Sequence, residues 1–258
     1  MTALRLVLVV LAAAAGGAVN AIAGGGTLIT FPTIVALGLD PRIANATSTV
    51  ALWPGSASSM WGYRDELRGA GRWIRHLTLP SLVGGAIGAW LLLRTSSAAF
   101  ARIVPFLVLG ATVLFFAQGP LMRRIRGPAP LEGGPRVPLV PLGMFYMLQC
   151  GVAVYGGYFG AGAGILMLAE LGLMGLTNIH TMNGVKNWAG LCLNFVAATA
   201  FALNGVVDWP VALAMAAGGL AGGYGGSRLA QRVGQQRVRH AVVAVGLLAF
   251  VWLLLRRK

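Results

Sequence analysis

The chain alternates between long apolar stretches and short polar ones. Ten apolar segments follow one another, and most approach or exceed the length of about 18 residues that crosses a bilayer as one helix. Two of the ten are too short for a straight crossing of a hydrocarbon core about 30 Å thick. The pattern predicts an all-α membrane protein of about ten helical segments, two of which stop half way. The segments span about 3–23, 27–39, 43–63, 74–93, 100–118, 138–159, 163–176, 181–203, 209–229 and 239–255, the second and the seventh being the short ones.

Composition supports a membrane protein and argues against a nucleic-acid-binding one. Of the residues, 57% are hydrophobic and only 10% charged, whereas soluble domains carry about 25% charged residues. The net charge of +14 comes from arginine clusters between apolar segments, which is typical of cytoplasmic loops, and no soluble basic domain is present. The first apolar segment continues directly into sequence that recurs later, so we expect it to belong to the mature fold and not to a cleaved signal peptide.

The chain is similar to itself at a constant offset of 138 residues. Glycine-rich membrane helices can match by composition alone, but an asparagine pair within the alignment does not arise that way. We therefore expect a duplicated unit, with a first repeat at 1–118, a basic Pro/Gly-rich linker at 119–137 and a second repeat at 138–258. The matched pairs include Gly24 with Gly162, Gly26 with Gly164, Leu28 with Leu166, Asn45 with Asn183, Gly84 with Gly222, Gly88 with Gly226 and Arg94 with Arg232.

Charged loops predict how the two repeats are oriented. The positive-inside rule places three arginine-rich loops in the cytoplasm. The loop 204–208, equivalent to the first of them, has no Lys or Arg and is expected outside. Equivalent loops on opposite sides indicate an inverted-topology repeat with both termini outside, although the basic tail 256–258 argues against that orientation. The loop arginines are Arg64, Arg68, Arg72 and Arg75, then Arg123, Arg124, Arg126 and Arg136, then Arg228, Arg232, Arg237 and Arg239.

Glycine-rich stretches precede both short segments and indicate a substrate site. A helix that begins inside the membrane leaves backbone N–H groups unpaired, and these carry partial positive charge that favours an anion. In transporters built from inverted repeats, such interrupted helices form the binding site near the membrane midplane. We therefore expect Thr27 and the backbone N–H groups near Gly26 and Gly164 to bind an anion. The alternative is that these glycines serve only close helix packing.

Two polar patches, equivalent under the 138-residue offset, add candidate side chains. They lie at the beginning of the third and eighth segments, where donor groups are concentrated. Helix capping and interhelical hydrogen bonds are the alternative role for their asparagines, but capping does not explain a lysine. The candidate substrate-binding side chains here are Asn45, Thr47, Ser48, Asn183, Lys186 and Asn187.

Two charged residues fall within the second repeat's apolar segments. A charge there is costly unless it is paired or hydrated, so each is a functional candidate. Lys186 is predicted to be the counter-charge of an anionic substrate, the alternatives being snorkelling to the surface or an ion pair with Glu170. Glu170 is the candidate for taking up a coupling proton, and it could instead face a loop near the membrane surface.

Other classes of function have little support in the sequence. No nucleophile lies in a G-x-S-x-G setting and three isolated histidines give no metal-ligand spacing, so we expect no enzyme, no metal and no cofactor. An intramembrane enzyme would lack a catalytic constellation. A non-transporting membrane sensor or assembly subunit is the remaining alternative, and a large soluble appendage would favour it.

Both halves contain runs that resemble the TauE/SafE family of sulfite exporters. The resemblance implies a duplicated helical bundle in the bacterial inner membrane that moves sulfite, sulfoacetate or related organosulfonates, usually outward. Together with the predicted site, it favours a secondary transporter that works by alternating access on a small anion, with the proton as candidate coupling ion. The runs are NAIAGGGTL at 20–28, FP at 31–32, ANATS at 44–48, PGS at 54–56, GGYFGAG at 156–162, MNGVKN at 182–187 and GGYGG at 222–226.

Overall fold

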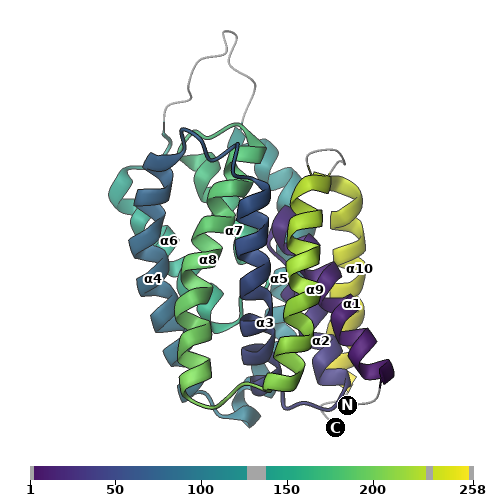
Figure 1. The fold of residues 1–258 in the computed structure, drawn as a ribbon. Coiled ribbons are helices and arrows are strands. Elements are labelled where there is room, and N and C mark those ends of the chain that lie inside the picture. The colour runs from purple at the N-terminus through teal and green to yellow at the C-terminus, as the bar shows by residue number, and fades with distance from the viewer. Residues whose placement is uncertain (1–2, 127–137, 231–234, 256–258) are drawn as a thin grey trace.

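The structure is a computed structural model that describes residues 3–126, 138–230 and 235–255. Within these ranges the chain forms ten α-helices in one bundle (Figure 1), and each predicted apolar segment corresponds to one of them. The all-α prediction is therefore confirmed. The helices are α1 (Ala3–Ala23), α2 (Thr27–Ala36), α3 (Pro41–Gly62), α4 (Gly71–Arg94), α5 (Ser97–Arg126), α6 (Leu142–Tyr158), α7 (Ala163–Leu173), α8 (Ile179–Leu203), α9 (Trp209–Ala230) and α10 (Gln235–Leu255).

Helix lengths separate full crossings from partial ones. Within the described residues, three segments are long and apolar enough to span a membrane by length and composition: α1, α4 and the 97–117 part of α5. α2 has 10 residues and α7 has 11, which at 1.5 Å per residue is about half of a core about 30 Å thick. The two short segments predicted from the sequence are therefore short helices. α5 continues past the predicted end at 118 as far as Arg126. Pro120 lies inside this helix and does not end it.

The connections alternate between the two ends of the bundle. α1 begins and α10 ends at one end, whereas α5 ends and α6 begins at the other (Figure 1). The arginine-bearing connection between α3 and α4 lies at that second end, and the connection 204–208 between α8 and α9 lies at the end that holds both termini (Figure 1). The two equivalent loops thus lie at opposite ends. The rest of the linker at 127–137, with Arg136, as well as Arg232 and the tail 256–258, lie outside the described residues.

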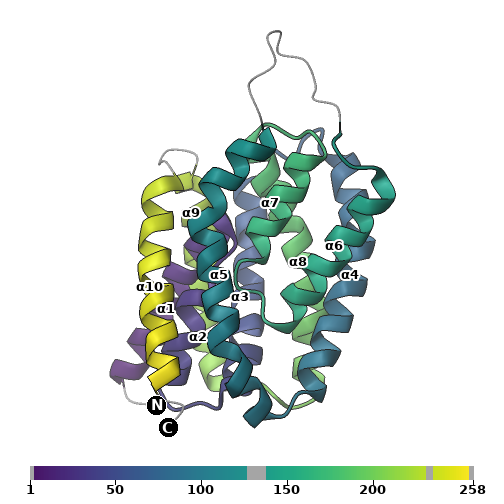
Figure 2. The ribbon, with the colours of Figure 1, turned by 180° about the vertical axis from the view of Figure 1, so that it is seen from behind.

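Helices of the first half of the chain pack mainly on helices of the second half. α1 packs on α9 while its counterpart α6 packs on α4, and α3 packs on α9 while its counterpart α8 packs on α4. α5, seen in front in Figure 2, contacts α7 and α10, and α10 in turn contacts α2. Each contact therefore has an equivalent under the 138-residue offset, as a duplicated chain predicts. The superposition of the halves about an axis in the membrane plane stays a prediction.

Glycines make the closest of these helix contacts. A Cβ atom at Gly222 of α9 would collide with the backbone of Ala14 in α1. In the equivalent contact, a Cβ atom at Gly84 of α4 would lie 2.5 Å from the carbonyl oxygen of Cys150 in α6. Small residues that let helix backbones touch are the usual means of association in lipid. Close packing explains these glycines, whereas Gly24, Gly160 and Gly162 beside α2 and α7 also adopt a left-handed backbone conformation.

Candidate functional site

Two chain breaks meet in the middle of the bundle. Gly24, directly after α1, has φ +78°, and Gly160 and Gly162, between α6 and α7, have φ +85° and +81°. Side chains rarely tolerate this left-handed backbone conformation, so glycine permits the sharp reversals. The backbone N–H of Gly162 donates to the carbonyl oxygen of Gly24 at 3.2 Å. Because these two glycines are equivalent under the 138-residue offset, the two breaks contact each other at matching positions.

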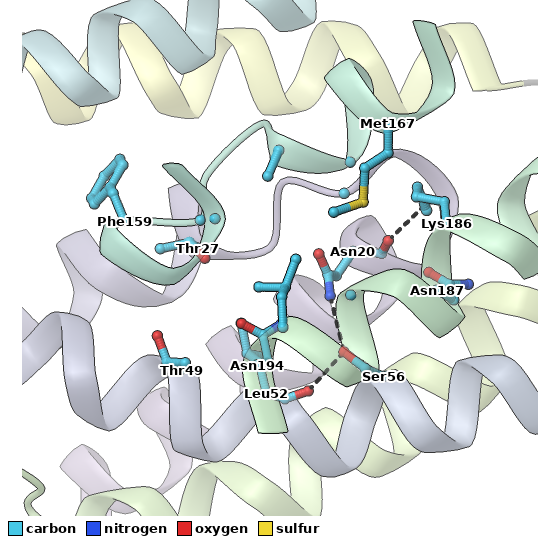
Figure 3. A pocket seen from close by; sticks show the side chains of 17 residues that line it. Asn20, Thr27, Thr49, Leu52, Ser56, Phe159, Met167, Lys186, Asn187 and Asn194 are labelled. Carbon is cyan, nitrogen blue, oxygen red and sulfur yellow. Dashed lines mark hydrogen bonds between the residues drawn. The ribbon is translucent and has the colours of Figure 1, made fainter. Parts of the chain in front are cut away.

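The first residues of α2 and α7 line one cavity, shown in Figure 3. Its volume is about 50 Å³, enough for a few water molecules. Within the described residues, the backbone N–H groups of Thr27 and Gly164 donate to no backbone carbonyl. Both short helices thus begin at a common cavity, and α7 begins at Ala163, where the predicted seventh segment begins.

Helices α3 and α8 form the polar walls of this cavity (Figure 3). Each contributes residues spaced three and seven apart, which share one face of a helix. Asn20 of α1 also lines the cavity, and its amide donates to the Ser56 hydroxyl at 3.5 Å. The lining positions on the two helices are equivalent under the 138-residue offset: Thr49 with Asn187, Leu52 with Gly190, and Ser56 with Asn194.

Lys186 lines the cavity while its ammonium group contacts the end of α1. The side chain is 2% exposed, which excludes snorkelling to the surface. Its Nζ donates to the carbonyl oxygens of Asn20 at 3.0 Å and Ala21 at 3.1 Å, and the Asn187 amide donates to Ala21 at 3.4 Å. These carbonyls belong to the last turn of α1, where the helix carries partial negative charge. Within the described chain Lys186 forms no ion pair with Glu170.

The equivalent contact in the other half uses a neutral group. The Asn45 amide donates to the carbonyl oxygen of Tyr158 at 3.0 Å, and Tyr158 is the equivalent of Asn20 under the offset. Ser48 occupies the position equivalent to Lys186 and shares a hydrogen bond with the Thr30 hydroxyl. The ends of α1 and α6 are thus each capped by a side chain from the opposite half: α1 by the Lys186 ammonium and α6 by the Asn45 amide.

The other predicted binding residues lie away from the cavity. The Thr47 hydroxyl accepts a hydrogen bond from the Asp208 backbone N–H at 3.0 Å, and Gly26 packs against Gly16. Asn183 is buried, and neither polar atom of its side chain has a partner within the described residues. Together with Asn45 and Ser48, these positions do not line the cavity. The predicted residues that do line it are Thr27, Gly164, Lys186 and Asn187.

Four polar residues of the cavity were missed by the sequence analysis: Asn20, Thr49, Ser56 and Asn194. The predicted residues of α3 and α8 lie in the polar patches that begin these helices, whereas Ser56 and Asn194 lie further along the same helices. A signal was present, because the polar positions recur seven residues apart on both helices and match across the 138-residue offset.

Glu170 lies outside the cavity lining, in the last turn of α7. It is 3% exposed, and within the described chain neither carboxyl oxygen has a hydrogen-bond partner. A carboxyl group buried without a partner is energetically costly, so Glu170 stays a candidate for a functional group. Its burial excludes a solvent-exposed position for Glu170.

Comparison with known proteins supports a transport role. A protein of Haemophilus influenzae named "Probable membrane transporter protein" is 28% identical over 232 residues, 87% of this chain and 85% of that protein. "Probable membrane transporter protein YfcA" of Escherichia coli K12 is 29% identical over 238 residues, 89% of this chain and 82% of that protein. "Probable membrane transporter protein ORF9" of a Sinorhizobium species is 28% identical and covers 94% of this chain and 90% of its own length. No solved structure matches.

The family assignment rests on a match over almost the whole chain. Residues 8–253 fit the model of the family described as "Sulfite exporter TauE/SafE". The matched range includes both helix breaks, the cavity and all ten helices in whole or in large part. The chain, a multi-pass bacterial membrane transporter and not an enzyme, therefore belongs to the TauE/SafE family of sulfite exporters.

Proposed function

We propose that this transporter exports a small sulfur-containing anion, such as sulfite, sulfoacetate or a related organosulfonate, through the cavity between α3 and α8. The observation that supports this most is the chemistry of the cavity wall. It combines the free N–H groups of two helix starts with one lysine and several amide and hydroxyl groups, and its lining residues include no Asp or Glu. Such a wall attracts an anion and has no carboxylate that would repel it.

The arrangement of donors suits an anion with several acceptor oxygens. A sulfite or sulfonate group presents three oxygens, which the side chains of Thr27, Asn187 and Asn194 could meet together with the Lys186 ammonium. Lys186 has three N–H groups, and the described residues provide acceptors for two of them. Many neutral donors with one cation also permit release, whereas a cluster of arginines would retain the anion. The volume of about 50 Å³ favours sulfite over larger sulfonates unless the cavity widens.

The position of the cavity supports a mechanism of alternating access. The cavity is lined by α2, α7, α3 and α8, so residues of both halves would surround the substrate. A movement of one set of helices against the other would open this cavity first to one side of the membrane and then to the other. We propose that the two halves are inverted repeats and that the contacts from Lys186 and Asn45 change during this movement.

The function can be tested with purified protein in proteoliposomes. We expect saturable flux of labelled sulfite, inhibition of that flux by sulfoacetate, and weak inhibition by taurine, whose own ammonium would meet Lys186. Protein-free liposomes provide the background. Absence of sulfite flux would contradict the proposal, and sulfite binding without flux would support a membrane sensor instead.

Proton coupling, with Glu170 as the group that takes up the proton, forms the second part of the proposal. Glu170→Gln keeps the shape of the side chain but cannot exchange a proton. We expect the variant to lose sulfite accumulation driven by a pH gradient, while sulfite exchange at equal pH persists. The measurement is labelled sulfite uptake with and without an imposed gradient, and Asp65→Asn, at an exposed position between α3 and α4, is the control. A variant that remains responsive to the gradient would remove Glu170 from coupling.

A further inference from the structure

Two carbonyl oxygens at the end of α1 accept hydrogen bonds from the Lys186 ammonium. The oxygens of Asn20 and Ala21 lie 3.0 and 3.1 Å from Nζ. The lysine stem passes close to Gly164, where an added Cβ would lie 3.1 Å from the lysine Cδ. Lys186 is 2% exposed and is one of the residues that line the polar cavity. A positive charge is thus held where one helix ends inside the bundle.

Carbonyl ends of interrupted helices are the usual ligands of coupling cations in secondary transporters. Their oxygens point along the helix axis and carry about half a negative charge in sum. In the equivalent place at the end of α6, the neutral Asn45 amide caps the Tyr158 carbonyl. The two halves therefore differ in one respect that matters for charge, because only the end of α1 is capped by a side-chain cation.

We propose that the Lys186 ammonium fills an alkali-cation site at the end of α1 and so takes the place of a mobile coupling cation. The proposal deepens the anion-transport function above, on which it rests, by naming what balances the substrate's charge. A tethered ammonium of about the size of K⁺ meets the same carbonyl oxygens as a free cation would, but it cannot dissociate. Transport then needs no Na⁺ or K⁺ at this position.

Small substitutions at position 186 should convert the tethered cation into a bound one. In Lys186→Ala and Lys186→Ser the two carbonyl oxygens of Asn20 and Ala21 stay, and the space of the ammonium becomes free for an alkali ion whose other ligands are water. We would measure the thermal unfolding midpoint in LiCl, NaCl, KCl and N-methyl-D-glucamine chloride at constant ionic strength. Wild type should unfold at the same temperature in all four salts. Each variant should gain about 2–4 °C with its preferred cation at about five times the dissociation constant.

Two controls separate loss of charge from loss of volume. Lys186→Arg keeps a cation in place and should not respond to alkali ions. Ser48→Ala removes a buried polar group at the equivalent position of the other half and should not respond either. Variants that fold but show no preference among the four salts would overturn the proposal, as would an equal preference in wild type. If Lys186→Arg folds while both small variants fail to fold in every salt, the proposal is also overturned, since an alkali ion should replace the ammonium.

The outcome is independent of the test of anion transport. Sulfite flux in wild type with small variants that ignore alkali ions would overturn the cation site and leave the function intact. Absence of sulfite flux in wild type with cation-responsive variants would overturn the function and retain the site.

Discussion

Replacing Lys186 by alanine should lower sulfite flux by roughly 10- to 100-fold at a substrate concentration below saturation. Lys186 is the one cation among the residues that line the cavity, and a hydrogen bond to a charged group contributes about 1.5–3 kcal/mol. The variant also loses the two contacts that hold the last turn of α1. Labelled-sulfite uptake by proteoliposomes, measured in NaCl and in N-methyl-D-glucamine chloride, gives the flux.

Controls for Lys186 address charge, shape and folding separately. Lys186→Arg should restore flux only in part, because a guanidinium is larger and planar. Arg68→Ala, which removes a loop arginine with an 83% exposed side chain, should leave flux unchanged. Because Lys186 and Glu170 are not in contact, the destabilisation caused by Lys186→Ala and Glu170→Gln should add in the double variant. Undiminished sulfite flux in Lys186→Ala would exclude the lysine from the site.

Gly24→Ala should both destabilise the protein and abolish transport. A Cβ atom there would lie 2.8 Å from the backbone nitrogen of Gly164 and closer still to its Cα, at a φ of +78°. The unfavourable backbone conformation costs about 1 kcal/mol and the collision about 1–3 kcal/mol. Together these should lower the unfolding midpoint by about 5–15 °C. Flux should disappear because the two helix breaks are forced apart where the substrate binds.

A second glycine isolates the collision from the backbone strain. Gly38 has φ +101°, and a Cβ atom added to it would meet nothing within 4 Å. Gly38→Ala should therefore show only the smaller backbone cost and retain sulfite flux. Equal unfolding midpoints for the two variants would mean that the Gly24–Gly164 contact does not hold the breaks together.

The helices could be predicted from the sequence because apolar length is a strong and local signal. The two short helices and their glycine breaks also follow from local pattern, since the apolar runs at 27–39 and 163–176 are too short to cross the bilayer, and lipid cannot satisfy the backbone groups at their ends. The end of α5 was misplaced because Pro120, which often ends a helix, is accommodated inside this one. Local sequence does not reveal whether neighbouring helices will satisfy the carbonyl that a proline leaves free.

The site was predicted only in part, for a reason that concerns distance along the chain. Thr27 and Gly164 follow from the helix breaks, and Lys186 from the cost of a charge in lipid. That Lys186 contacts the carbonyls of α1 depends on packing between residues 166 apart, which no local pattern encodes. The 138-residue offset identified Gly24 and Gly162 as equivalent, but equivalence does not imply the hydrogen bond that joins them.

The packing of first-half helices on second-half helices has a consequence for biosynthesis. α1 enters the membrane first, yet the lysine that caps its end lies 166 residues later, which at 5–20 residues per second takes roughly 8–33 s to translate. α9, on which α1 packs, follows later still. During this interval the carbonyl of Ala21, whose donors Lys186 and Asn187 both lie in α8, must be hydrated or sheltered by the insertion machinery, because lipid offers it no donor. Nascent chains released before α8 is inserted should thus be substrates of membrane quality control, even though each of their helices has already formed.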